Sequence, residues 1–423
     1  MLRISDVRSR SPILMNSVRA PSPSPQPTNA VPLARLFAYT QSVDLEPYLA
    51  RTKRGVSTLA LSLVWLALAW RGTGRPHQLG WLTEPLLAAL LGVARLPTPQ
   101  TLHRSLAYFT AHALRAAVET AYLAELPHRS GRIWAALDAH QLPYWGRGKR
   151  ELLRKGWSGN HSRALRGYRL YLAVDTDTGQ VITFVLLRGN ARDHRLTAVL
   201  AARVRRLLGR RLAGVVADSG FTSHAAVEAL LAARIPFILG FARSAHVRAR
   251  LQTLTGQQRR WLQALGAIRL GGCPWDPRLQ FLALRARTPT EGRGPWVYVT
   301  SIQGLGARRL AQFYRQRWRV EQAIDELVNG HDLDHLVTYR LHPNRVAVGF
   351  RLLARNLAIG LQIHEAQARP AVIREPVAFR ALYVDGLGLF HRQHATLVVT
   401  PHVPTGPAVW ALPWTRQRVR LVA

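Results

Sequence analysis

An alternation of short apolar strands and helices between residues 132 and 241 constrains the fold more than any other feature. Three strand patterns come first, and a turn at Asp175–Gln180 joins the second and third into a hairpin. The full series is Arg132–Asp138, Tyr168–Val174, Val181–Leu187, helix Arg195–Arg210, Gly214–Asp218, helix Ser223–Arg234 and Pro236–Phe241. This order predicts an α/β fold, a mixed sheet flanked by helices.

Two carboxylates stand at the ends of strands in this series. Asp138 ends the first strand and Asp218 ends the fourth. Functional groups gather at the carboxyl ends of strands in α/β sheets, so both are candidate site residues. Aspartate is equally typical of turns and helix caps, and the hairpin residues Asp175 and Asp177 are interpreted in that way.

A third carboxylate lies on a long helical pattern at residues 307–329, which follows the strand Trp296–Ile302. Tyr314, Arg317 and Glu321 recur at three- and four-residue steps and therefore share one helix face. By itself this is also the pattern of an ordinary surface Arg/Glu pair. Glu326 is the main rival for the helix carboxylate, and Asp193 is a spare one.

Asp138, Asp218 and Glu321 form one site if the two strands are neighbours and the helix packs across them. Three converging carboxylates repel one another unless divalent cations lie between them. Mg²⁺ prefers oxygen ligands and keeps waters and substrate phosphates in its shell. A pair of such ions supports phosphoryl transfer by activating the nucleophile and stabilising the leaving oxygen.

Three ordered motifs resemble the DDE transposases of IS4-type insertion sequences. Their helix motif is similar to Tyr314, Arg317 and Glu321, and Asp218-Ser219-Gly220-Phe221 looks like their Asp-x-Gly-Phe. Leu137-Asp138, followed by Pro143-Tyr144-Trp145-Gly146, resembles their first-aspartate region.

The resemblance, over roughly residues 130–365, implies an RNase H-like core with a β-rich insertion. It makes Asp138, Asp218 and Glu321 the ligands of two Mg²⁺ ions, with Mn²⁺ able to substitute. It makes Tyr314 and Arg317 phosphate contacts. It also implies cut-and-paste transposition by a homodimer on double-stranded DNA, namely terminal inverted repeats and target DNA.

Two positions qualify this resemblance. The family motif has a lysine seven residues after the glutamate, where this chain has Val328, so a DNA contact is lost or supplied elsewhere. Trp261 lies where related transposases place an aromatic residue that stabilises a flipped base. Packing in the core is the alternative interpretation, and the one favoured for Trp261, because tryptophan is usually well buried.

The charge balance points to a polyanionic partner. The chain has 58 Lys+Arg against 23 Asp+Glu, a net charge of +35, which favours nucleic acid over an anionic membrane surface. The arginine bias is also typical of a GC-rich genome. Within the basic stretch at residues 147–166 we expect Lys149, Arg150, Lys155 and Trp157 to contact DNA. A solvated basic loop is the alternative.

The predicted organisation has four parts. Residues 1–30 are rich in Pro and Ser and are expected to be disordered. Residues 31–128 are helical, either as a DNA-binding domain or as a bundle that packs on the next domain. Residues 129–365 form the catalytic domain, with an insertion at 243–294. The pattern of residues 366–423 predicts no particular role.

Other segments carry weaker signals. The apolar run Val56–Trp70 is too short to span a bilayer and predicts a buried helix. A single cysteine, Cys273, fits a reducing compartment, here the bacterial cytoplasm at the nucleoid. His331-Asp332-Leu333-Asp334-His335 has metal-ligand types at close spacing, and His140 lies near Asp138. Helix caps and loops are the favoured explanation for the 331–335 motif, and a surface position at the strand end explains His140 at least as well as a contact with the site.

Three functions fit these features. The main expectation is a DDE transposase; the others are a transposase-derived DNA-binding protein without activity and a structure-selective nuclease. The sequence does not indicate the terminal repeat, the target preference or the route of end release. It also does not show whether the protein starts at Met1 or at Met15.

Overall fold

A computed structural model of the protein describes most of the chain. The described residues are 25–28, 32–50, 57–74, 85–147, 153–158, 161–242, 244–273, 275–285, 295–366, 373–385, 387–393, 396–402, 408–412, 414 and 417–421. Lys149 and Arg150, two of the predicted DNA contacts, lie outside these residues, as do residues 1–24.

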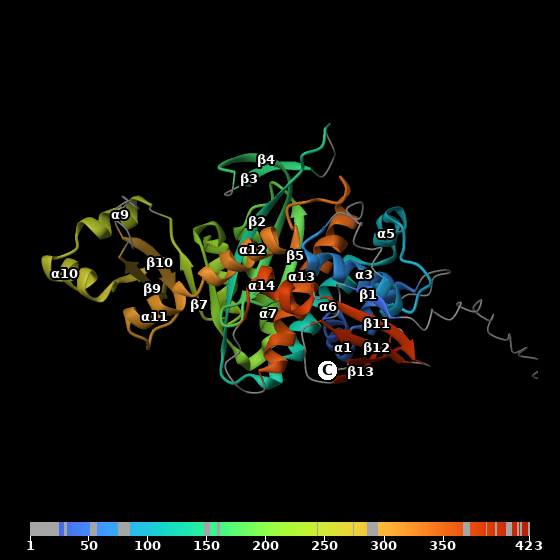
Figure 1. Cartoon of the computed structure of the whole chain (residues 1–423). Coiled ribbons are helices and arrows are strands. Elements are labelled where there is room, and N and C mark those ends of the chain that lie inside the picture. Colours follow the sequence, from blue (N-terminus) through green and yellow to red (C-terminus); the bar gives the residue numbers. More distant parts are fainter. Residues whose placement is uncertain are drawn as a thin grey trace, which may run out of the picture.

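A mixed sheet of nine described strands runs through the centre of the molecule (Figure 1). Its order is β3-β4-β2-β6-β7-β10-β9-β8, and β5 pairs with β4. The strands are β2 Ile133–Pro143, β3 Arg154–Ser158, β4 Arg163–Asp175, β5 Val181–Arg188, β6 Leu212–Ala217, β7 Phe237–Gly240, β8 Ala267–Cys273, β9 Asp276–Leu284 and β10 Trp296–Thr300.

Five of these strands, in the order β5-β4-β2-β6-β7, form the core of the fold. β5, β4 and β2 are antiparallel, whereas β6 and β7 run parallel to β2. Alternate residues face opposite sides of the sheet. One side packs on α7 (His194–Leu208) and α8 (His224–Ala232). The other packs on α12 (Trp318–His331) and α13 (Leu341–Glu365). The predicted RNase H-like α/β fold is confirmed.

The insertion extends this sheet and also adds helices. After β7 the chain forms α9 (Ala245–Gln252) and α10 (Gly256–Leu265), which lie at the left of Figure 1. β8 and β9 then form a hairpin, and β9 pairs with β10. The insertion is therefore part helix and part strand.

The N-terminal helices share one hydrophobic core with α12 and α13. They are α1 Leu33–Ser42, α2 Glu46–Leu49, α3 Thr58–Arg71, α4 Pro85–Leu90, α5 Pro99–Ser105 and α6 Ala111–Ala124. α3 is buried along its whole length except at Arg71. α5 and α6 do not form one continuous helix, because α5 ends at Ser105 and α6 begins at Ala111. The Thr110 hydroxyl accepts a hydrogen bond from Ala113 N (3.0 Å) and starts α6 anew.

α13 is the central helix of this region. The Trp70 indole donates to the Ala354 carbonyl (2.7 Å), and the Phe109 and Phe350 rings meet edge to face at 5.1 Å. A Cβ on Gly349 would lie 2.7 Å from the Leu114 side chain, so this glycine permits α6 to pack closely. By length and apolar composition α13 is able to cross a membrane, yet 94% of its most apolar window is buried inside the protein.

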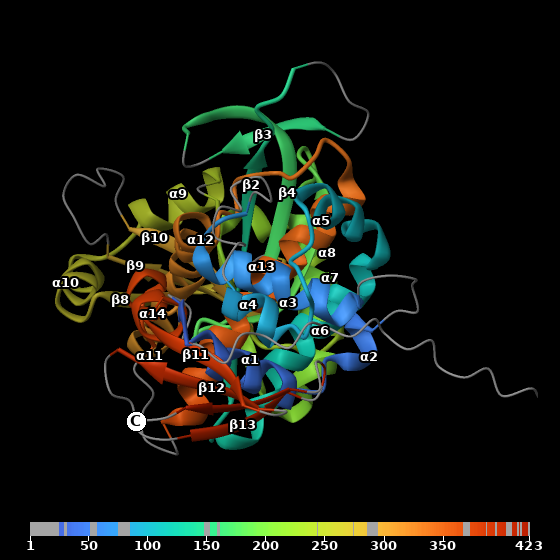
Figure 2. The same ribbon diagram turned by 45° about the vertical axis from the view of Figure 1, so that its right-hand side comes forward.

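A second, five-stranded sheet closes the molecule, and Figure 2 shows it beside α1 and α14. It contains β1 Gln26–Thr28, β11 Gly388–Gln393, β12 Thr396–Pro401, β13 Ala408–Leu412 and β14 Gln417–Leu421, with α14 (Pro376–Tyr383) before it. Disorder expected throughout residues 1–30 is wrong for Gln26–Thr28, which pair with β11. Pro27 suits this edge position because it lacks an N–H group.

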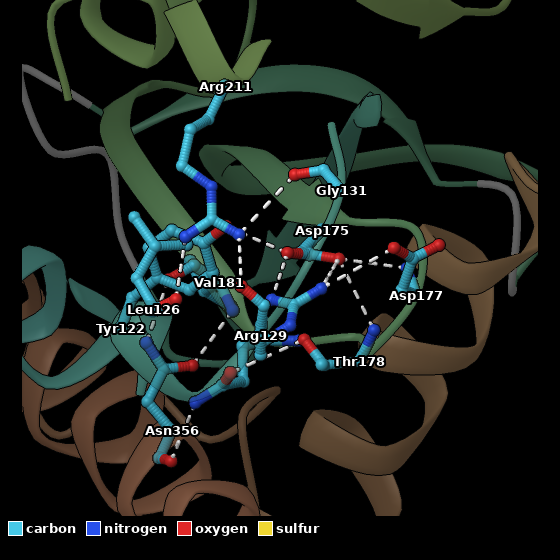
Figure 3. Close-up of polar contacts among 11 residues, drawn as sticks. Tyr122, Leu126, Arg129, Gly131, Asp175, Asp177, Thr178, Val181, Arg211 and Asn356 are labelled. Atoms are coloured by element: carbon cyan, nitrogen blue, oxygen red, sulfur yellow. Dashed lines mark hydrogen bonds and ion pairs between the residues drawn. The ribbon is translucent and has the colours of Figure 1, made fainter. Parts of the chain in front are cut away.

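A buried ion-pair network ties the β4–β5 turn to α6 (Figure 3). The Asp175 carboxylate has no exposed surface and accepts hydrogen bonds from Tyr122 (2.7 Å) and Arg129 (2.6 Å). Burial and the Asp175 charge raise the pKa of Tyr122 well above its usual range, so its hydroxyl stays a donor. Nearby, Asn356 of α13 bonds both backbone groups of Val181 and caps the edge of β5. This network fixes the sheet end opposite the candidate site.

Candidate active site

Asp138 and Asp218 come from neighbouring parallel strands. β2 and β6 pair in a register that sets Leu137 opposite Ala217, and the residue that follows each of these two is an aspartate. The residue two positions before each aspartate faces the hydrophobic cluster beneath α12 and α13. Side-chain alternation therefore directs both carboxylates to the face that α12 covers.

Asp138 does not end its strand, and the sequence prediction is wrong on this point. β2 continues to Pro143, and Asp138 pairs with Leu172 of β4. The parallel pairing with β6 ends one residue earlier, at Leu137. The carboxylate thus lies where β6 ends beside a continuing strand.

The Asp218-Ser219-Gly220-Phe221 turn holds the second carboxylate. Asp218 Oδ1 accepts a hydrogen bond from Gly220 N (2.9 Å), and the Phe221 ring is fully buried. A Cβ on Gly240 of β7 would lie 2.7 Å from Ser219 N, so glycine there lets the turn pack on the sheet. The structure therefore gives a reason for the residue type at each position of this motif except Ser219.

The helix pattern at residues 307–329 is two helices. α11 (Ala307–Arg315) ends and α12 begins with Arg317 as its N-cap residue. Across the joint the hydrogen bonds span three residues, from Arg317 N to Tyr314 O (2.9 Å) and from Val320 N to Arg317 O (3.0 Å). This tightened turn replaces the expected continuous helix. Tyr314 near the end of α11 and Glu321 in the first turn of α12 still flank Arg317.

The Arg317 guanidinium links the carboxylates of the site. Its Nη1 lies 3.5 Å from Asp138 Oδ2, and its Nη2 pairs with Glu321. Burial raises the pKa of Asp138 to about 7; Arg317 opposes this rise, and the Asp218 and Glu321 charges add to it. Burial likewise raises the pKa of Asp218, against the effect of Arg317. The pKa of Asp138 therefore depends on the charges of both other predicted carboxylates.

This donor set fits divalent magnesium or manganese. All three side chains offer hard carboxylate oxygens, the ligand type that Mg²⁺ takes. The Glu321 side chain is 53% exposed, whereas that of Asp138 is 16% exposed, so the group opens toward solvent on one side.

The rival acidic and histidine residues have other partners. Glu326 Oε2 accepts from Arg355 of α13 (2.6 Å), whereas Glu321 pairs with Arg317 beside Asp138. Asp193 pairs with Arg169 (2.7 Å), and its Oδ2 would lie 3.3 Å from a Cβ on Gly220, beside Asp218. His140 contacts Asp334 (2.6 Å). In the His331–His335 motif, the buried His331 meets the Ala69 carbonyl (2.9 Å), so that motif does not converge on one ion.

The family lysine position offers no DNA contact. Val328 is half-buried and packs against the main hydrophobic core. The contact that the family lysine makes is therefore absent from this position.

A cavity of about 650 Å³ lies next to Asp218. Tyr314, Arg317, Trp296 and Trp318 are among its lining residues. The two indoles are 44% and 49% exposed. The sequence interpretation gave neither tryptophan a role, because the strand and helix patterns that contain them do not reveal a shared cavity.

The position of Trp261 contradicts one of the two interpretations made for it and leaves the other untested. Its side chain is 49% exposed on α10, so packing in the core is wrong. It is not among the residues that line the cavity beside Asp218. A contact between Trp261 and DNA stays a prediction for the outer face of the insertion.

A twisted ribbon of β3 and the start of β4 projects from the sheet at the top of Figure 1. Lys155 is exposed on β3, and the Trp157 indole is 61% exposed. Trp145 is 58% exposed, and the Arg163 guanidinium lies 5.9 Å from its ring centre. The predicted contacts that the structure describes are thus accessible basic and aromatic groups.

Comparisons with known proteins bear on this geometry in different ways. No curated protein matches the chain. Among solved structures, the chain is similar to a cryo-EM structure of the piggyBac transposase synaptic complex with hairpin DNA, at 11% identity and a TM-score of 0.49. That match covers 85% of this chain and 82% of the other.

The family comparison is decisive. A family model described as the transposase DDE domain matches residues 130–357, which contain Asp138, Asp218 and Glu321 and make up more than half of the chain. The match begins just before β2 and ends within α13. Since the matched segment carries the RNase H-like core, this chain belongs to the DDE transposase family.

Proposed function

We propose that the protein cuts and rejoins DNA at the ends of its own IS4-type insertion sequence, in a cut-and-paste reaction. The observation that carries this proposal is the meeting of Asp138, Asp218 and Glu321 around Arg317 on one face of the core. The three carboxylates hold two Mg²⁺ ions, for which Mn²⁺ substitutes. Such ions supply activation of the attacking hydroxyl and stabilisation of the leaving oxygen.

The remaining groups bind and orient DNA in this proposal. Arg317 and Tyr314 line the cavity beside Asp218 and contact a phosphate of the reacting strand. Lys155 and Trp157 on the β3–β4 ribbon, together with Lys149 and Arg150, follow the DNA backbone. The net charge of +35 supports this binding. We propose a homodimer on two transposon ends in the bacterial cytoplasm, at the nucleoid.

A cleavage and joining assay tests this function. The substrate is duplex DNA with the inverted repeats that flank the coding region, incubated with a plasmid target and Mg²⁺, Mn²⁺ or EDTA. Metal-dependent release of the ends and their insertion into the plasmid support a transposase. Cleavage without joining, on any sequence, identifies a nuclease instead. Specific binding without cleavage identifies a protein that has lost activity.

Metal affinity is expected to depend on pH through Asp138. Its pKa of about 7 means that a proton occupies this carboxylate in acid and competes with the metal. Affinity for Mn²⁺ should therefore fall about tenfold for each pH unit below 7 and level off above it. Titration of Mn²⁺ followed by electron paramagnetic resonance measures this dependence. An affinity that is constant from about pH 6 to about pH 8 contradicts the role given to Asp138.

Trp318 is expected to stack on a nucleobase in the cavity. Replacing it with alanine should weaken binding of a transposon end with unpaired terminal nucleotides by about 1–3 kcal/mol, or roughly 5- to 150-fold in Kd. Fluorescence anisotropy measures the loss. Trp318→Phe is the matched control, because it keeps an aromatic ring at the same place in the cavity and should retain most of the affinity. Equal losses in the alanine and phenylalanine variants contradict stacking by Trp318.

A further inference from the structure

Glu125, His128 and His364 lie together beside α13, on the described part of the chain but outside the residues of the candidate active site. One donor atom from each, a carboxylate oxygen and two imidazole nitrogens, lies within 4.8 Å of the other two. Glu125 is 3% exposed, whereas both histidines are exposed. The cluster is therefore buried at Glu125 and open to solvent at the two histidines.

Local geometry brings the first two residues together. α6 ends at Ala124, and a 3-10 turn at Leu126–His128 follows, with Glu125 as its N-cap residue. His128 N donates to the Glu125 carbonyl at 3.3 Å. Side chains three residues apart eclipse on a 3-10 turn, so this turn presents a carboxylate and an imidazole on one side.

The third residue comes from α13, and a glycine makes the approach possible. Gly360 precedes His364 by four residues and shares its helix face. A Cβ on Gly360 would lie 2.2 Å from the Tyr39 hydroxyl and 3.4 Å from Glu125 Cγ. The absent side chain thus gives space to Tyr39 and Glu125. The rings of His128 and His364 meet edge to face at 6.2 Å.

Tyr39 of α1 orients the buried carboxylate. Its hydroxyl donates to Glu125 Oε1 at 2.5 Å, and burial, followed by this hydrogen bond and the Glu125 charge, raises the pKa of Tyr39 far above its usual range. Glu125 Oε2 is buried and has no hydrogen-bond partner among the described residues. A buried carboxylate oxygen without a partner is unfavourable unless a cation or donor reaches it.

We propose that Glu125, His128 and His364 bind one Zn²⁺ ion. Two imidazoles and one carboxylate are a ligand set that zinc takes, with a fourth position left for water. Tetrahedral bonds of about 2.1 Å place donors about 3.4 Å apart, so small side-chain rotations close the cluster. Tyr39 orients Oε1, as outer partners of metal ligands do. The ion joins the turn before β2 to the end of α13 and acts as a structural clamp.

Zinc binding is measured on the full chain without a polyhistidine tag, in excess Mg²⁺. We compare wild type with the His128→Ala/His364→Ala double variant by equilibrium dialysis and by visible absorption of Co²⁺. The double variant should bind one zinc ion fewer per chain and lose the tetrahedral Co²⁺ bands. Its thermal unfolding should no longer shift upward with Zn²⁺. Both histidines are exposed, so the variant is expected to fold.

Two further variants make the test specific. Tyr39→Phe removes the hydroxyl that holds Oε1 and should weaken Zn²⁺ binding by about 10- to 100-fold. His224→Ala breaks an exposed His224–Glu228 pair on α8 and should leave zinc binding unchanged. Equal zinc content and equal Co²⁺ spectra in wild type and the double variant overturn the proposal, as does the absence of tight zinc binding in wild type.

Discussion

Replacing Asp218 with alanine is expected to reduce strand cleavage by about 10³-fold or more, which corresponds to roughly 4 kcal/mol of transition-state free energy. Asp218 lies beside Asp138 on the neighbouring strand and lines the cavity with Arg317. Its loss removes a metal-binding carboxylate and leaves the positive charge of Arg317 less balanced. The measurement is the initial rate of end cleavage in saturating Mg²⁺, with circular dichroism as a check on folding.

A matched control separates catalysis from charge. Asp325 is an exposed carboxylate on α12, one turn after Glu321, and Asp325→Ala removes the same charge outside the site. We expect this variant to cleave at nearly the wild-type rate. Binding of the terminal repeat should be retained in Asp218→Ala, since phosphate contacts dominate affinity. Equal cleavage by wild type and Asp218→Ala would remove Asp218 from the catalytic machinery.

The second large effect concerns stability and lies at the opposite end of the sheet. Asp175→Ala is expected to lower the free energy of unfolding by about 3–5 kcal/mol, because it leaves a buried arginine without its partner. Arg129 is 13% exposed and Asp175 is fully buried. The Tyr122 hydroxyl also loses its acceptor. Urea unfolding followed by tryptophan fluorescence measures the change through the transition midpoint.

The neighbouring Asp177 provides the control for this prediction. It lies 3.5 Å from the same Arg129 guanidinium, but its side chain is 54% exposed. Asp177→Ala should therefore cost less than about 1 kcal/mol, as exposed ion pairs do. Similar losses in the two variants would mean that burial does not set the strength of this network.

Sequence periodicity was sufficient to predict the core of the fold. Short apolar runs marked β4, β5 and β6, and the order of strands and helices led to the mixed sheet. It was not sufficient for the extent of β2. Whether that strand stops at Asp138 depends on pairing with Leu172 and later residues of β4, which are distant in sequence. The local pattern of apolar residues does not indicate how far β2 pairs with a strand that is distant in sequence.

The candidate site shows the same division. Three carboxylates in the right order were visible in the chain, but the break at Arg317 was not, because neither proline nor glycine marks it. The cavity was hidden for another reason. Trp296 comes from β10 and Trp318 from α12, so their approach exists only after β10 has joined the extended sheet. By contrast, Thr110 is a typical N-cap residue, so the sequence does indicate where α6 begins.

The burial of α13 has a consequence for synthesis on the ribosome. α3 ends at Arg71, and α13, which covers it, begins at Leu341, about 270 residues later. At a synthesis rate of about 5–20 residues per second, roughly 15–55 seconds pass between the synthesis of the apolar α3 and that of its main packing partner, α13. During that time a nascent chain presents an uncovered hydrophobic helix. Ribosome-associated chaperones are therefore expected to decide how much of this protein matures and how much aggregates.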